Sequence, residues 1–100
     1  MSNFKQINFG IIGCGIAGEK HALAISKTKN TKLVAVCSKS NLSAIKLASK
    51  YAGTIVMDVN EMIKSKKIDV VCICSPNFCH SEQVLYAISN KKHVIVEKPL

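Results

Sequence analysis

Arginine is missing from this chain of 100 residues, although 14 lysines against six acidic residues give a formal net charge of +8. A basic surface of this kind can attract nucleic acid. Proteins that read DNA sequence, however, commonly use the planar guanidinium of arginine to recognise guanine, and the lysines here are scattered over many segments. We therefore expect no nucleic-acid partner, and some of the positive charge can serve an anionic cofactor instead.

Long apolar runs are also missing. The chain has no stretch of about 18 apolar residues that could span a membrane. Asn3, Lys5 and Gln6 interrupt any apolar run at the N-terminus, and no cleavage-site pattern follows. With two prolines, no low-complexity tract and 48% hydrophobic residues, the composition is that of a globular domain. We expect a cytoplasmic protein with no membrane partner.

The cysteines form no recognisable framework. Their number is odd, and their spacing fits neither a disulfide set nor a metal site; they are Cys14, Cys37, Cys72, Cys74 and Cys79. Cys72 and Cys74 lie two residues apart in an apolar run, so they would share one face of a strand. We expect both to be small buried hydrophobic residues, and we expect no metal.

Short apolar runs alternate with helical patterns along the whole chain. The runs at 7–12, 34–36, 54–57, 70–74 and 94–96 are expected to be strands. Because these runs are continuous rather than alternating, they suit strands that are covered on both faces. Five strands separated by four helices predict an α/β fold, a doubly wound parallel sheet with right-handed crossovers and helices on both faces.

Capping residues mark the ends of two of the expected helices. Ser40 or Asn41 can cap the second helix, and Gly53 is expected to end it. Asp58 can cap the third, where Glu61 lies at the spacing of a capping box. Apolar residues at helical spacing are expected to face the core: Ala44, Leu47, Ala48 and Tyr51 in the second helix, Val59, Met62 and Ile63 in the third, and Val84, Ala87 and Ile88 in the fourth, which opens at Asn77 or Ser81.

A glycine-rich turn follows the first expected strand and opens the first helix, which is the context that the G-x-G-x-x-G pattern requires. In dinucleotide-binding domains the first glycine allows a tight turn, the second lets the backbone approach the pyrophosphate, and the third lets helix and strand pack closely. The N–H groups at the helix start then face the anion. The alternative is a tight turn without a ligand. The predicted cofactor contacts are Gly13, Cys14, Gly15, Ile16, Ala17 and Gly18.

No acidic residue ends the second expected strand. In NAD-binding domains an Asp or Glu about 20 residues beyond the turn holds the ribose hydroxyls, but here Cys37 is followed by Ser38 and Lys39. Ser38 can donate a hydrogen bond to a 2′-phosphate and Lys39 can neutralise it, whereas a carboxylate would repel it. We therefore favour NADP over NAD as the cofactor. The alternative is that Lys39 is an ordinary solvated loop lysine.

The C-terminal third carries a further set of motifs. Cys74-Ser75-Pro76-Asn77 is followed by His80 and Glu82, and the run from Lys92 to Leu100 contains Glu97-Lys98-Pro99. With the glycine turn and His21, these motifs resemble the Gfo/Idh/MocA (glucose–fructose oxidoreductase / inositol dehydrogenase) family over the whole chain. The resemblance implies the N-terminal NAD(P)-binding Rossmann domain of an oxidoreductase, which transfers a hydride between the nicotinamide and a hydroxyl carbon of a sugar, polyol or nucleotide sugar.

The resemblance also implies roles for individual residues. Lys98 is the catalytic candidate, because a lysine beside the nicotinamide can hydrogen-bond the substrate oxygen and lower its pKa. His80 is equally open to a structural role at a helix start. The family's catalytic histidine and nearby aspartate belong to a second domain and have no counterpart here. Further cofactor contacts implied by the resemblance are Ser75, Pro76, Asn77, His80, Glu97 and Lys98.

Residues 1–100 are thus expected to be a single Rossmann domain, truncated at its C-terminal end and inactive by itself. The main alternative is a non-catalytic dinucleotide-binding module from a truncated family member. A methyltransferase-like Rossmann fold is a third possibility, although such folds usually keep an acidic residue after the second strand. Because an isolated sheet of this kind would expose apolar surface, we also expect a homo-oligomer or self-association.

Overall fold

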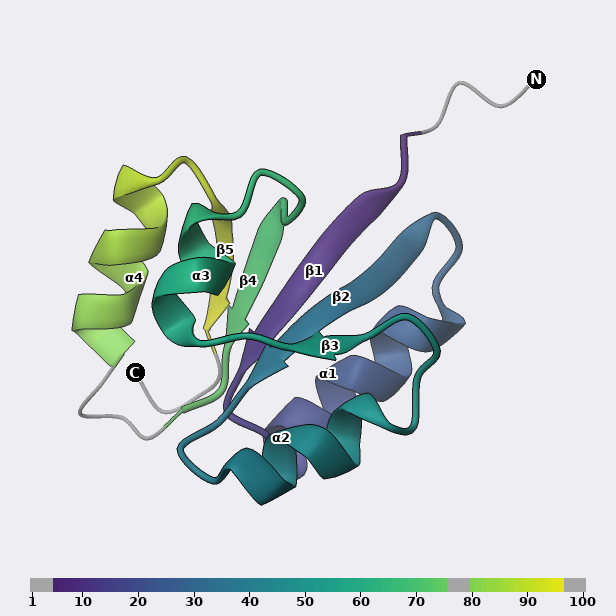
Figure 1. Cartoon of the computed structure of the whole chain (residues 1–100). Coiled ribbons are helices and arrows are strands. Elements are labelled where there is room, and N and C mark those ends of the chain that lie inside the picture. The colour runs from purple at the N-terminus through teal and green to yellow at the C-terminus, as the bar shows by residue number, and fades with distance from the viewer. Residues whose placement is uncertain (1–4, 76–79, 97–100) are drawn as a thin grey trace.

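The computed structural model describes residues 5–75 and 80–96, without the side chains of residues 80 and 81. Strands and helices alternate along this part of the chain (Figure 1): β1 (Ile7–Ile12), α1 (Ile16–Lys27), β2 (Thr31–Cys37), α2 (Asn41–Ala48), β3 (Ile55–Val56), α3 (Val59–Lys64), β4 (Val70–Ile73), α4 (His80–Ser89) and β5 (His93–Val96). All strand pairs are parallel, in the order β3-β2-β1-β4-β5. The predicted doubly wound α/β fold is confirmed.

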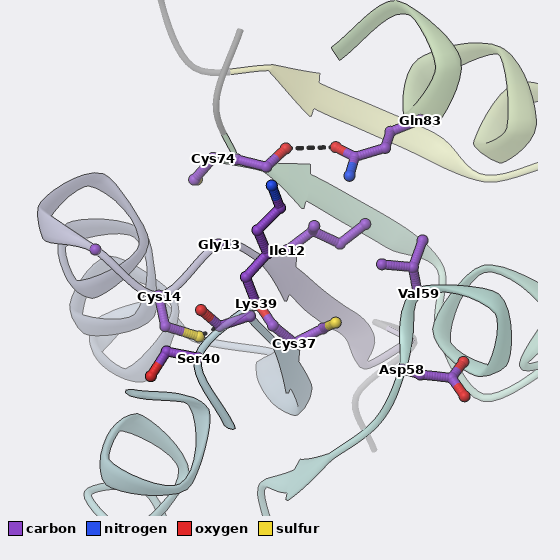
Figure 2. Close-up of a pocket in the computed structure, with 13 residues that line it drawn as sticks. Ile12, Gly13, Cys14, Cys37, Lys39, Ser40, Asp58, Val59, Cys74 and Gln83 are labelled. Carbon is purple, nitrogen blue, oxygen red and sulfur yellow. Dashed lines mark hydrogen bonds between the residues drawn. The ribbon is translucent and has the colours of Figure 1, made fainter. Parts of the chain in front are cut away.

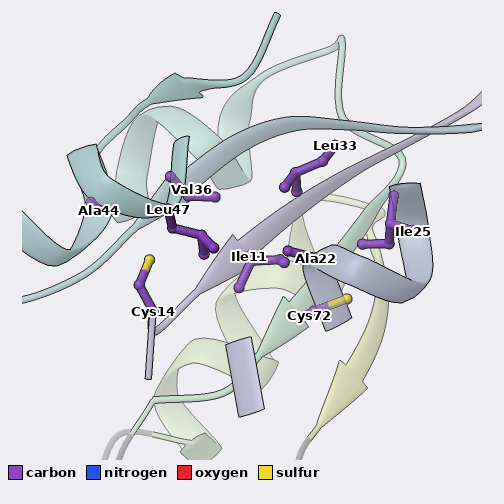
Figure 3. Close-up of a cluster of buried hydrophobic side chains, with 9 residues drawn as sticks. All are labelled: Ile11, Cys14, Ala22, Ile25, Leu33, Val36, Ala44, Leu47 and Cys72. Carbon is purple, nitrogen blue, oxygen red and sulfur yellow. The ribbon is translucent and has the colours of Figure 1, made fainter. Parts of the chain in front are cut away.

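The sheet separates two hydrophobic cores. Successive residues of a strand point to opposite faces, so Ile11 packs with residues of α1 and α2, whereas Ile12 packs with residues of α3 and α4. The first core is drawn in Figure 3 and consists of Ile11, Cys14, Ala22, Ile25, Leu33, Val36, Ala44, Leu47 and Cys72. Because both faces are covered, the central strand β1 is held rigidly where it delivers the glycine turn.

Two cysteines of β4 and the turn after it belong to this first core. Cys72 is buried, and Cys74 is half-buried against the same cluster, as the spacing in the sequence predicts. Burial raises the pKa of the Cys72 thiol to about 11. Within residues 5–75 and 80–96, no group of three or more metal-ligating side chains could hold an ion, and no helix is long and apolar enough to cross a membrane.

The predicted helix caps are present. The Ser40 hydroxyl accepts a hydrogen bond from the backbone N–H of Ser43, at 3.2 Å, and so begins α2. Asp58 Oδ1 accepts from the backbone N–H of Glu61, at 2.7 Å, and begins α3. Among the described residues the return bond from the Glu61 side chain is absent, so only half of the expected capping box forms.

The expected end of the second helix is wrong. Helix α2 ends at Ala48, and the chain then tightens into turns in which the backbone N–H groups of Lys50 and Tyr51 bond the carbonyls three residues earlier. Gly53, with a φ of +83°, serves the later turn into β3. Tyr51 therefore lies outside the helix but still packs against the first core.

Two other expectations fail at the edges of the sheet. Ile88 is 57% exposed rather than buried, because α4 lies over the β4–β5 edge and turns Val84, Tyr86 and Ala87 toward the second core. Strand β3 is the opposite edge strand, and both of its residues, Ile55 and Val56, are exposed rather than covered on two faces.

Candidate functional site

A pocket of about 690 Å3 lies at the carboxyl edge of the sheet, where β1 ends between β2 and β4. In doubly wound sheets this is the point where the crossovers reverse direction and ligands bind. The volume is in the ordinary range for a small-molecule site. The pocket is lined by Ile12, Gly13, Cys14, Gly15, Cys37, Ser38, Lys39, Ser40, Asp58, Val59, Cys74, Ser75 and Gln83, which Figure 2 draws.

The first and third glycines of the turn have no room for a side chain. Gly13 has a φ of +98°, and a Cβ there would lie 2.7 Å from the backbone of Cys74. A Cβ on Gly18 would lie 2.1 Å from the carbonyl oxygen of Gly13. The turn is therefore pressed against β4 on one side and against its own helix on the other, in the manner expected for these two positions.

The second glycine faces open space. A Cβ on Gly15 would meet no heavy atom within 4 Å, although Gly15 lines the pocket and is the N-cap of α1. Among the described residues no side chain caps this helix, so its first N–H groups are left available for an anion, as at the helix termini that bind phosphate. This bare backbone beside a pocket fits a pyrophosphate, because an anion can approach the helix start without a side chain in its way.

Hydrogen bonds hold the turn and the end of β1 between the ends of β2 and β4. The backbone N–H of Gly13 donates to the Cys37 carbonyl at 2.7 Å, and the Cys14 thiol donates to the same oxygen at 3.4 Å. On the other side, the backbone N–H of Cys74 donates to the Ile12 carbonyl at 2.8 Å. Burial raises the pKa of the Cys14 thiol to about 11, so the thiol keeps its proton at neutral pH.

Ser38 and Lys39 lie together on the β2 side of the pocket. Figure 2 shows the Lys39 side chain extending across the pocket, with its amino group directed to the end of β4 in this view. Asp58 also reaches the pocket lining, from the carboxyl end of β3. Its carboxylate turns toward α3, where it caps the helix. Burial, and secondarily the Asp58 charge, raises the pKa of the Cys37 thiol.

Gln83 was not expected in the site. It lies on α4 and lines the pocket opposite β2, where its Oε1 accepts a hydrogen bond from the Ser75 hydroxyl. The available signal in the sequence was its position one helical turn after His80, which places both residues on one side of a helix. The other unforeseen lining residues are Ile12, Cys37, Ser40, Asp58, Val59 and Cys74, most of which were assigned to strands, caps or core.

The remaining predicted residues divide into two groups. Ile16, Ala17 and Gly18 form the first turn of α1, and Ile16 is 77% exposed; none of the three lines the pocket. Helix α4 begins at His80, and the structure describes the backbone of this residue but not its side chain. The other predicted residues lie outside the described residues, and these are Pro76, Asn77, Glu97 and Lys98. On this side of the sheet, β4 pairs with β1 and β5 pairs with β4.

Residues 7–100 match the model of a protein family described as oxidoreductase, NAD-binding Rossmann fold, of the Gfo/Idh/MocA type. The chain belongs to the Gfo/Idh/MocA oxidoreductase family. Among its curated relatives is glucose-6-phosphate 3-dehydrogenase of Bacillus subtilis (strain 168), 37% identical over 91 residues. The match covers 91% of this chain and 25% of that protein. The chain thus spans about a quarter of the length of this relative.

Solved structures of similar fold contain both nicotinamide cofactors. The scyllo-inositol dehydrogenase of Lactobacillus casei, solved with NAD(H) and scyllo-inositol, aligns at a TM-score of 0.83 and 36% identity, covering 95% of this chain and 28% of that one. Biliverdin reductase from Synechocystis sp. PCC 6803, solved with biliverdin and NADP+, aligns at 0.89 and 27% identity, covering 96% and 30%. A shared Rossmann domain therefore serves different cofactors and substrates.

Proposed function

We propose that this chain binds NADP as the cofactor-binding part of an oxidoreductase that transfers a hydride between the nicotinamide and a hydroxyl carbon of a sugar, polyol or nucleotide sugar. The observation that carries the proposal is the open position at Gly15, where bare backbone at the start of α1 lines a pocket at the carboxyl edge of the sheet. Phosphate groups are the ligands that such helix termini favour.

The choice of NADP rests on the β2 side of the pocket. Ser38 can donate to a 2′-phosphate, and the ammonium of Lys39 offsets its charge. Asp58, the acidic residue of the pocket lining, is committed to capping α3 by its hydrogen bond to the Glu61 backbone. A 2′-phosphate at Ser38 would gain the attraction of the Lys39 ammonium, a contact that NAD would not make because it has no 2′-phosphate.

The bound nicotinamide supplies the hydride chemistry. Within this chain, Ser75 would contact the cofactor from the end of β4, and Lys98 would hydrogen-bond the substrate hydroxyl and favour its deprotonation. The substrate pocket and the acid or base that moves the proton are assigned to other parts of a longer protein, so residues 1–100 alone are expected to bind cofactor without turning over substrate. A cytoplasmic, homo-oligomeric oxidoreductase completes the proposal.

Calorimetric titration of residues 1–100 with NADP+ and NAD+ tests the proposal. NADP+ should bind more tightly, and Lys39→Ala should weaken NADP+ about tenfold while leaving NAD+ nearly unchanged, since one charge-assisted contact is lost. Lys66→Ala is the matched control, because it removes the same charge from the exposed amino edge of the sheet. Binding of neither dinucleotide would refute the function, and equal or tighter NAD+ binding would refute the preference for NADP.

A further inference from the structure

We propose that Gln83 selects the base of the bound dinucleotide by donating its side-chain amide N–H to N1 of adenine. The inference rests on the proposed function, and it assigns a recognition role to a residue of α4 that the sequence motifs did not indicate. Three observations support it: the orientation of the Gln83 amide, the apolar walls beside it, and the position of α4 across the pocket from β2.

The Ser75 hydroxyl fixes the orientation of the Gln83 amide. Because Ser75 Oγ donates to Gln83 Oε1, the carbonyl end of the amide is occupied and its Nε2 is turned toward the pocket. Gln83 is half-buried and lines the pocket, and within the described part of the chain its Nε2 has no hydrogen-bond partner. A donor held in this way is favourable only for a ligand that presents an acceptor, because a second donor would leave both groups unpaired.

The walls beside this donor are apolar. The side chains of Ile12, Cys37 and Val59 come from β1, β2 and the start of α3, belong to the second hydrophobic core, and are drawn on the α3 side of the pocket in Figure 2. The thiol of Cys37 stays protonated at neutral pH, since burial raises its pKa. A flat heterocyclic base can pack against such a surface, whereas phosphates and riboses favour the polar edge at Gly15 and Ser38.

The sheet order decides which edge of the base meets Gln83. A ribose held at Ser38 and Lys39 lies at the end of β2, and β1 separates β2 from β4, which precedes α4. The base is joined to that ribose by its five-membered ring, so its six-membered ring extends across the pocket toward α4. N1 of adenine lies on this far edge and is an acceptor, but the corresponding nitrogen of hypoxanthine carries a proton and is a donor.

Comparing NADP+ with its hypoxanthine analogue, deamino-NADP+, tests this role in the 1–100 chain. The native chain should bind NADP+ about tenfold more tightly than the analogue, because the protonated N1 of hypoxanthine would face the amide N–H of Gln83 and neither donor would find an acceptor. Gln83→Glu keeps the shape of the side chain and the acceptor for Ser75 but turns the group facing the base into an acceptor. It should reverse the preference toward the analogue, and Gln83→Leu should reduce the ratio to about one.

The ratio of the two affinities separates recognition from general damage. Both dinucleotides carry the same charge, so repulsion from the new carboxylate cancels in the ratio, and loss of folded protein lowers both affinities equally. A native ratio near one, or an unchanged ratio in Gln83→Glu, would overturn the role of Gln83 while leaving the proposed function intact. Failure of the native chain to bind either compound would overturn both.

Discussion

Replacing Gly15 with alanine should separate cofactor binding from folding. The φ of Gly15 is −83°, which alanine adopts without strain, and the added Cβ meets no heavy atom within 4 Å. We therefore expect the free energy of unfolding to change by less than about 1 kcal/mol, the small loss at an N-cap being offset by reduced freedom of the unfolded chain. The methyl group, however, enters the space through which a pyrophosphate would reach the helix start.

The expected loss of affinity follows from the contact that the methyl group prevents. A charge-assisted hydrogen bond from a backbone N–H contributes about 1.5–3 kcal/mol, so NADP+ should bind roughly 10- to 100-fold more weakly to Gly15→Ala. Urea unfolding and calorimetric titration of the same samples measure the two effects separately. The melting temperature should move by only a few degrees, since about 1 kcal/mol corresponds to roughly 4–8 °C in a domain of this size.

Gly18→Ala is the matched comparison because it introduces the same methyl group three residues later. There the Cβ would lie 2.1 Å from the Gly13 carbonyl oxygen, and backbone must move. We expect a loss of about 3 kcal/mol or more of stability. Wild-type NADP+ affinity in a stable Gly15→Ala variant would refute the assignment of the phosphate site, and a stability loss as large as that of Gly18→Ala would refute the open geometry at Gly15.

Two further predictions concern stability alone. Asp58→Ala should lower the free energy of unfolding in urea by about 1 kcal/mol, because the N-cap bond to the Glu61 backbone is lost. Asp58→Asn keeps an oxygen acceptor and should retain most of the native stability. Equal losses in both variants would contradict the capping role. The second prediction concerns pH. Folding raises the pKa of the Cys72 thiol from 9.0 to about 11, so the stabilisation that depends on the protonated thiol is fully present below pH 9 and is lost as the pH rises to 11. Between pH 9 and pH 11 the free energy of unfolding of Cys72→Val should therefore fall by about 2 kcal/mol less than that of the native chain. Parallel profiles of unfolding free energy against pH for the two proteins would contradict this.

The motifs that depend on local geometry could be predicted from the sequence. Strand β1 was expected at residues 7–12, where the structure has it, because an apolar run that ends at a glycine turn leaves little choice of boundary. The caps at Ser40 and Asp58 were likewise identified, since a short side chain with an oxygen acceptor is needed one residue before the helix. Local chemistry determines these features, so the sequence is sufficient to locate them.

Features that depend on tertiary contacts were harder to predict. Ile88 lies at helical spacing with Val84 and Ala87, but its exposure depends on how far α4 overhangs the edge of the sheet. Gly53 was expected to end α2, although turns at Lys50 and Tyr51 end it first. The pairing of Ser75 with Gln83 joins a turn to a helix and follows from the way that α4 packs on β4, which no spacing in the sequence expresses.

The central claim is that a nicotinamide dinucleotide binds at the glycine turn, and mapping amide chemical shifts of the 15N-labelled chain during an NADP+ titration tests it most directly. We predict saturable shifts at Gly13, Gly15 and Ser38, with little change at Lys66 and Lys91 on the amino edge of the sheet. Shifts confined to those lysines, growing without saturation and disappearing with added salt, would contradict the claim, because they would show that the +8 chain merely attracts an anion.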